Sequence, residues 1–298
     1  MNVDTQDLRQ LFVAGVLLLF VAAFAFLNDT GTGKASNGAA GENGAALSLD
    51  ERVIPSGGVL LPITWGDMGE RMIAAGVIDV KKLELLYSSR GGMSPNMKNS
   101  LYGRDSETVT INRENANELL NLLWAFGLSN KNSILEHGPM MNPAYGADAG
   151  RFASTGGWTL AVGGAMDHYS AHSFVSLPRE QQEKVETVSK GIYRPCCGTP
   201  VYFPDCNHGM AMLGLLELLA AEDASEETMY DIALAVNAYW FPDTYMTLAT
   251  YFEQNGTNWD SVRPRVALGT DYSSVEGYRR VLEKIAPVDA PQGGSCGA

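Results

Sequence analysis

Residues 191–214, GIYRPCCGTPVYFPDCNHGMAMLG, form the stretch around which this chain is organised. The stretch contains three of the four cysteines of the chain, Cys196, Cys197 and Cys206, and one of its four histidines, His208. Thiolates and imidazoles are preferred ligands of zinc and copper. The stretch therefore predicts a centre built on metal ligation or on a disulfide.

The spacing of the cysteines favours metal ligation but leaves the disulfide open. Adjacent cysteines such as Cys196 and Cys197 rarely bond to each other, because the small ring that they would close is strained. The pattern C-C-x8-C-x-H lacks the paired C-x2-C spacing of zinc ribbons, and C-x-x-C-H for haem attachment is absent. In the alternative interpretation, Cys206 forms a disulfide with Cys196 or Cys197 and His208 is a hydrogen-bonded core residue.

An apolar helix is expected to follow over 209–223, GMAMLGLLELLAAED, with Asp205 or Asn207 as its N-cap. If Asp205 is the cap, Cys206 and His208 lie about 200° apart around the helix axis and hardly share an ion. If Asn207 is the cap, Cys206 lies in the loop and can fold back toward His208. In both cases the helix N-terminus favours a Cys206 thiolate.

Two further histidines precede the cysteine stretch. His168 and His172 stand four residues apart, so on a helix they would share one face and could bind one ion. Tyr169 occupies the position of the glutamate in H-E-x-x-H, so the general base of a zinc protease is missing. A helix over 178–190, ended by Gly191, would connect this pair to the cysteine loop. A solvated or core histidine pair is the alternative.

The predicted metal is zinc or copper. The candidate ligands are His168, His172, Cys196, Cys197, Cys206 and His208.

The N-terminal residues indicate a membrane anchor. Residues 11–27, LFVAGVLLLFVAAFAFL, are uniformly apolar and are just long enough to span a bilayer. We expect an uncleaved signal-anchor helix over 1–27, although cleavage after 23–25, AFA, is the alternative. Both interpretations place the rest of the chain outside the cytoplasm: anchored at a cell surface or in a periplasm if the segment is kept, and secreted if it is cleaved. A flexible linker over 28–52, rich in glycine, alanine and asparagine, is expected next.

The folded body is expected over 53–286 as one mainly helical domain with a few short strands and long loops. Helices are predicted at 66–76, 80–87, 113–127, 226–241, 244–256 and 274–286. Strands are predicted within 59–65 and 107–112, and loops over 88–106 and 128–165. Residues 287–298 read as a disordered tail that carries the odd cysteine, Cys296.

Charge and aromatic content limit the partners. The net charge of −13 argues against nucleic acid, because binding to phosphates needs a basic face. The aromatic junction at Tyr239–Tyr245 is interpreted as core and rim, with contact to a protein partner as the alternative.

The sequence is compatible with three functions. It shows no pair of carboxylates placed to act as a general acid and a general base. The first is a membrane-anchored extracytoplasmic metal-binding protein. The second is a thiol–disulfide oxidoreductase that uses Cys206 with Cys196 or Cys197 as its partner. The third is a binding or scaffold domain stapled by a disulfide.

Overall fold

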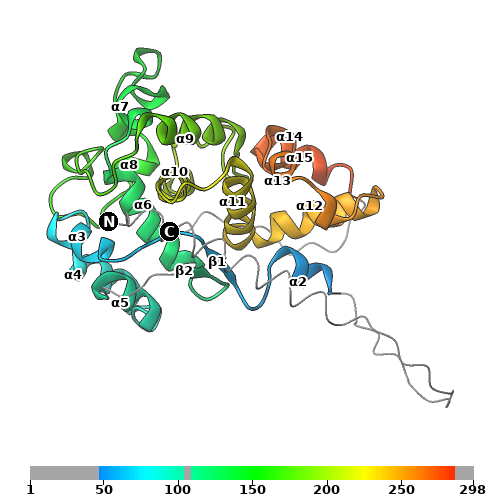
Figure 1. Ribbon diagram of the computed structural model, residues 1–298, viewed down its shortest axis with the longest axis horizontal. Coiled ribbons are helices and arrows are strands. Elements are labelled where there is room, and N and C mark those ends of the chain that lie inside the picture. The colour runs from blue at the N-terminus through cyan, green and yellow to red at the C-terminus, as the bar shows by residue number, and fades with distance from the viewer. Residues whose placement is uncertain (1–46, 104–108, 286–298) are drawn as a thin grey trace, which may run out of the picture. The chain divides into compact units, whose positions relative to one another are not determined.

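The helix at the centre of the fold is α10 (Asn207–Ala221). The computed structural model describes residues 47–103 and 109–285. All α10 residues from His208 to Ala220 are buried, as expected for a helix that is apolar on nearly every side. Four helices contact α10 and surround it in Figure 1: α6 (Ala116–Ser129), α8 (Ala153–Gly156), α9 (Arg179–Gly191) and α11 (Glu226–Trp240).

The central helices α6 and α10 approach each other at a pair of glycines. A Cβ atom on Gly127 would lie 2.2 Å from the Met210 carbonyl oxygen and 2.9 Å from the Gly214 nitrogen. The expectation that Gly127 ends its helix is therefore wrong, because α6 continues to Ser129. Glycine is required at position 127 because the backbones of α6 and α10 come into contact there, and not because the helix ends there.

The remaining elements cover this centre. The α12 helix (Pro242–Gln254) contacts α11, α2 (Leu49–Val53) and α15 (Val275–Leu282). The strands β1 (Val59–Leu61) and β2 (Val109–Ile111) form an antiparallel pair in which Val59 lies opposite Ile111. The short helices are α3 (Met68–Ala74), α4 (Val80–Ser88), α5 (Pro95–Tyr102), α7 (Ser133–His137), α13 (Pro264–Ala267) and α14 (Thr270–Ser273). Single 3-10 turns are η1 (Pro139–Met141), η2 (Pro143–Tyr145), η3 (Ala149–Arg151), η4 (Ala165–Asp167) and η5 (Trp259–Ser261).

The prediction of a mainly helical domain with few short strands is confirmed, and the described residues belong to one compact unit. Three further boundaries differ from the expectation, and one of them is the predicted loop over 128–165, which contains the short helices α7 and α8. The folded body begins within the predicted linker, where Ser48 caps α2 by accepting a hydrogen bond from the Glu51 N–H. The expected loop over 88–106 contains α5, which begins at Ser94 as N-cap and Pro95 as the first helical residue.

The aromatic junction belongs to the core. Tyr239 and Trp240 are buried, and Tyr245 is fully inaccessible to solvent. The Tyr239 hydroxyl donates to the Pro55 carbonyl and the Trp240 indole to the Ala116 carbonyl. These hydrogen bonds satisfy the polar ends of side chains whose rings fill the interior.

Within 47–103 and 109–285, no helix is both long and apolar enough to cross a membrane. The predicted anchor over 11–27, most of the predicted linker and the tail with Cys296 lie outside the described residues.

Candidate metal centre

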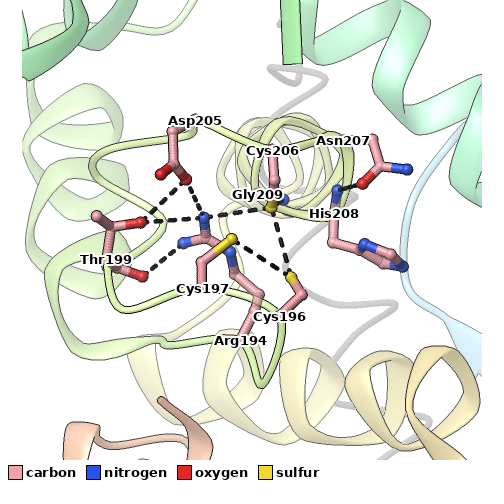
Figure 2. Close-up of polar contacts among 9 residues, drawn as sticks. All are labelled: Arg194, Cys196, Cys197, Thr199, Asp205, Cys206, Asn207, His208 and Gly209. Carbon is pink, nitrogen blue, oxygen red and sulfur yellow. Dashed lines mark hydrogen bonds and ion pairs between the residues drawn. The ribbon is translucent and has the colours of Figure 1, made fainter. Parts of the chain in front are cut away.

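The loop between α9 and α10 carries three cysteines and is folded by its own backbone hydrogen bonds. The Val201 N–H donates to the Ile192 carbonyl at 2.8 Å, which closes the base of the loop. A turn closed by a 3.1 Å bond from the Cys197 N–H to the Arg194 carbonyl presents Cys196 and Cys197 together. Figure 2 shows both thiols pointing toward the start of α10.

The three thiols converge without forming a disulfide. Cys196, Cys197 and Cys206 are all free and half-buried. The Cys196 sulfur lies 3.5 Å from that of Cys197 and 3.6 Å from that of Cys206, and the sulfurs of Cys197 and Cys206 are within 4.8 Å. In a tetrahedral site with Zn–S bonds of about 2.3 Å, the sulfurs lie about 3.8 Å apart. The spacing of the sulfurs is therefore close to that of a thiolate metal site.

His208 joins this group from the first turn of α10. One of its ring nitrogens lies within 4.8 Å of the sulfurs of both Cys196 and Cys206. The ring is buried against Trp240 and Phe241, with centroid separations of 5.7 and 4.5 Å. Its Nδ1 atom is buried and has no hydrogen-bond partner among the residues that the structure describes. A buried nitrogen without a partner is costly, which makes it a natural position for a ligand bond.

The N-cap of α10 is Cys206 itself, so both expected caps, Asp205 and Asn207, are corrected. The Cys206 sulfur accepts a hydrogen bond from the Gly209 N–H at 3.3 Å, in the place where a serine or aspartate oxygen usually stands. This geometry leaves Cys206 outside the helix and His208 inside it. The two side chains can therefore approach the same point.

A buried arginine lies beside the sulfurs. Arg194 is fully buried, and its guanidinium donates to Asp205 at 2.8 Å, to the Thr199 carbonyl at 2.8 Å and to the Cys206 sulfur at 3.4 Å. A Cβ atom on Gly209 would lie 2.7 Å from this guanidinium, so only glycine leaves room for it there. Asp205 is within 4.8 Å of Cys197 and Cys206, but its carboxylate is already occupied by the arginine.

Hydrogen bonding divides the charge unequally among the thiols. Hydrogen bonds from Cys196 and Cys197 hold the pKa of Cys206 well below its ordinary value, and the charge of Arg194 adds to this against the effect of burial. The same contacts and burial raise the pKa of Cys196. At Cys197 the bond with Cys196 lowers the pKa, but the bond with Cys206 and burial outweigh it and raise the pKa to about 12. These shifts favour the thiolate at Cys206 and the protonated thiol at Cys196 and Cys197.

The histidine pair does not join the cysteines. No helix forms at His168 and His172, because η4 ends at Asp167 and His172 pairs with Asn130 in a parallel bridge. The His168 Nε2 donates to the Val162 carbonyl at 2.9 Å, and its Nδ1 lies 3.1 Å from the His172 Nε2. The centroids of the two imidazole rings are 5.3 Å apart. This distance fits two rings that face each other through these two nitrogens.

The facing nitrogens of this pair have the geometry of an ordinary hydrogen bond. Neither His168 nor His172 belongs to a group of three potential ligands within the described part of the chain. Burial, together with the neighbouring His168, lowers the pKa of His172, which favours its neutral form. The structure thus separates the histidine pair from the other four candidate ligands, which lie in the loop before α10 and in its first turn.

Sequence reasoning missed Arg194, because an arginine in a loop is ordinarily exposed. One local signal was Gly209. Glycine weakens the first turn of a helix, so its presence there indicates that another group packs closely against the backbone.

Comparison of the chain with protein-family models, with curated proteins and with solved structures finds no match in any of the three.

Proposed function

We propose that this chain is a membrane-anchored extracytoplasmic protein that binds zinc or copper through the cysteine loop and the start of α10. The proposed ligands are drawn from Cys196, Cys197, Cys206 and His208. The observation that supports the proposal most is the cluster of three free thiols, two of which lie within 4.8 Å of a buried imidazole whose Nδ1 has no hydrogen-bond partner in the described chain. The anchor and the location rest on the apolar residues 11–27.

Two N–H groups support the thiolate form at this centre. The Cys206 sulfur accepts hydrogen bonds from the Gly209 backbone and from Arg194. Donors of this kind stabilise the negative charge of metal thiolates and orient the ligand. The cation of Arg194 is itself neutralised by Asp205 at 2.8 Å, so it does not leave a full positive charge facing an incoming metal ion.

The first experiment is elemental analysis of the full chain, purified in mild detergent without chelators, together with a count of free thiols. We expect about one equivalent of zinc or copper and no disulfide among Cys196, Cys197 and Cys206. Cys206→Ser should lose the metal, because both three-ligand groups of the described chain contain Cys206. His208→Ala should lower the affinity for the metal by about tenfold or more, since loss of a residue that only hydrogen-bonds to a metal ligand already lowers affinity by that much.

Matched controls are Cys296→Ser, which removes the cysteine outside the loop, and His137→Ala, which removes an exposed histidine at the end of α7. Both controls should keep the metal. Unchanged metal content in Cys206→Ser and His208→Ala would refute the centre. A metal-free protein with a disulfide at Cys206 would instead favour the thiol–disulfide oxidoreductase.

Removal of the ion should leave the helices folded. The candidate ligands stand on a loop and at one end of α10, whereas the rest of this buried helix contacts α6, α8, α9 and α11. We therefore expect far-UV circular dichroism to change little when a chelator extracts the metal. Unfolding on chelation would indicate a structural metal, because binding and folding are then the same event.

A further inference from the structure

The two cysteines best placed to form a disulfide are also two of the proposed metal ligands. The sulfurs of Cys196 and Cys206 are 3.6 Å apart, and a disulfide brings its sulfurs to about 2.05 Å. Closing that gap needs a movement of about 1.5 Å, which side-chain rotation and a small loop adjustment supply. Cys197 lies equally close to Cys196, but adjacent residues close a strained ring.

The two sulfurs differ in how firmly they are held. Cys206 is fixed at the N-cap of α10 by the hydrogen bonds from Gly209 and Arg194. Cys196 lies at the turn of the loop, half-buried, and its sulfur contacts only the other two sulfurs among the polar atoms described. A disulfide would therefore form by movement of Cys196 toward a stationary Cys206.

Formation of this disulfide would dismantle the metal site. Cys206 belongs to both groups of three potential ligands in the described chain, the one with Cys196 and His208 and the one with Cys197 and Asp205. An oxidised Cys206 leaves each group with too few donors to hold a zinc ion, which takes four ligands in a closed site. The remaining thiol, Cys197, shares no such group with His208.

We propose, resting on the metal centre proposed above, that the site is redox-controlled and that oxidation of Cys196 and Cys206 to a disulfide releases the metal. The oxidant is a small-molecule or protein disulfide. The Cys206 thiolate attacks one sulfur of that disulfide, which breaks its S–S bond and expels one thiolate. The Cys196 thiolate then attacks the Cys206 sulfur and expels the second thiolate. Two protein thiolates are oxidised, one external disulfide is reduced to two thiolates, and the metal leaves as the hydrated ion.

The test uses the full chain loaded with zinc and then treated with oxidised glutathione. Released zinc is followed with a chromophoric chelator, and the disulfide is located by mass spectrometry of proteolytic peptides. We expect loss of essentially all bound zinc, in step with one disulfide that links Cys196 to Cys206, and recovery of zinc binding after reduction with dithiothreitol. Cys296→Ser should behave identically, which excludes a contribution from the cysteine outside the loop.

Two variants test the pairing without depending on metal. In the metal-free protein, Cys197→Ser should still form the intramolecular disulfide, whereas Cys196→Ser should remain a mixed disulfide with glutathione at Cys206. Zinc that stays bound after the Cys196–Cys206 bond has formed, or release that accompanies a different disulfide, would overturn the proposal. A chain that takes up no zinc or copper at all refutes the metal centre itself, whereas a chain that binds metal and keeps it on oxidation refutes only the switch.

Discussion

Glu217 offers the sharpest test of the packing around α10. Its side chain is fully inaccessible to solvent, and one carboxyl oxygen accepts a 2.6 Å hydrogen bond from the Asn130 amide. The other carboxyl oxygen has no partner among the described residues. Burial raises the pKa of Glu217 to about 8, although the hydrogen bond from Asn130 and the nearby amide of Asn132 oppose the shift. The acid is therefore largely neutral in the folded protein at pH 7.

The direction of the pH effect follows from the raised pKa. Between pH 4.5 and 8 the folded protein keeps the proton on Glu217 while the unfolded chain has lost it. Unfolding then releases a proton, so this contribution to stability is complete below pH 4.5 and is lost as the pH rises toward 8. A pKa raised from 4.5 to about 8 corresponds to ~5 kcal/mol in total, of which ~3–4 kcal/mol falls between pH 5 and 8.

Glu217→Gln removes this dependence, because glutamine resembles the protonated acid and keeps an oxygen for the Asn130 amide. Urea denaturation, followed by circular dichroism between pH 5 and 8, should show similar stabilities for the two proteins at pH 5. By pH 8 the free energy of unfolding of the variant should exceed that of the wild type by ~3–4 kcal/mol. Glu84→Gln, at an exposed position of α4, is the matched control and should run parallel to the wild type. Parallel curves for Glu217→Gln as well would refute the assignment of a buried neutral acid.

Two further changes test how the helices are placed. Gly127→Ala should destabilise the fold by ~2–3 kcal/mol in urea denaturation, because the new Cβ atom would lie 2.2 Å from the Met210 carbonyl oxygen. Gly57→Ala is the control and should have little effect, because there is open space around Gly57. Ser94→Ala should cost ~1–2 kcal/mol in the same assay, since the Ser94 hydroxyl caps α5 through the Met97 N–H and also donates to buried Glu118. An unchanged midpoint in Ser94→Ala would mean that α5 does not depend on its cap.

Local signals predicted the helices whose ends are set by a single side chain. Asp79 caps α4 through the Lys81 and Lys82 N–H groups, and Ser225 caps α11 through the Thr228 N–H, as the sequence indicates. The α5 helix escaped prediction because its buried face consists only of Met97 and Leu101. Two apolar positions are too few to distinguish a short helix from a loop, although the Ser94-Pro95 start was visible.

Contacts between distant segments were out of reach of the sequence. The packing role of Gly127 depends on Gly214, which is far away along the chain, so Gly127 looked like an ordinary helix stop. The clustering of Cys196, Cys197 and Cys206 was predictable because the three lie in one loop. The separation of His168 from that loop was not, because the four-residue spacing to the next histidine suggests a helix that does not form.

In the metal centre that we propose, one sulfur is fixed and two are adjustable. Cys206 is attached to a helix that is buried from His208 to Ala220 and approaches α6 closely at Gly127 and Gly214. Cys196 and Cys197 stand on a loop, where small changes of backbone are cheap. A site built only of rigid ligands exchanges its ion slowly, whereas a site that combines rigid Cys206 and His208 with two thiols on a loop can open at low cost. This asymmetry favours a centre that takes up and releases its ion over one that only holds the fold together.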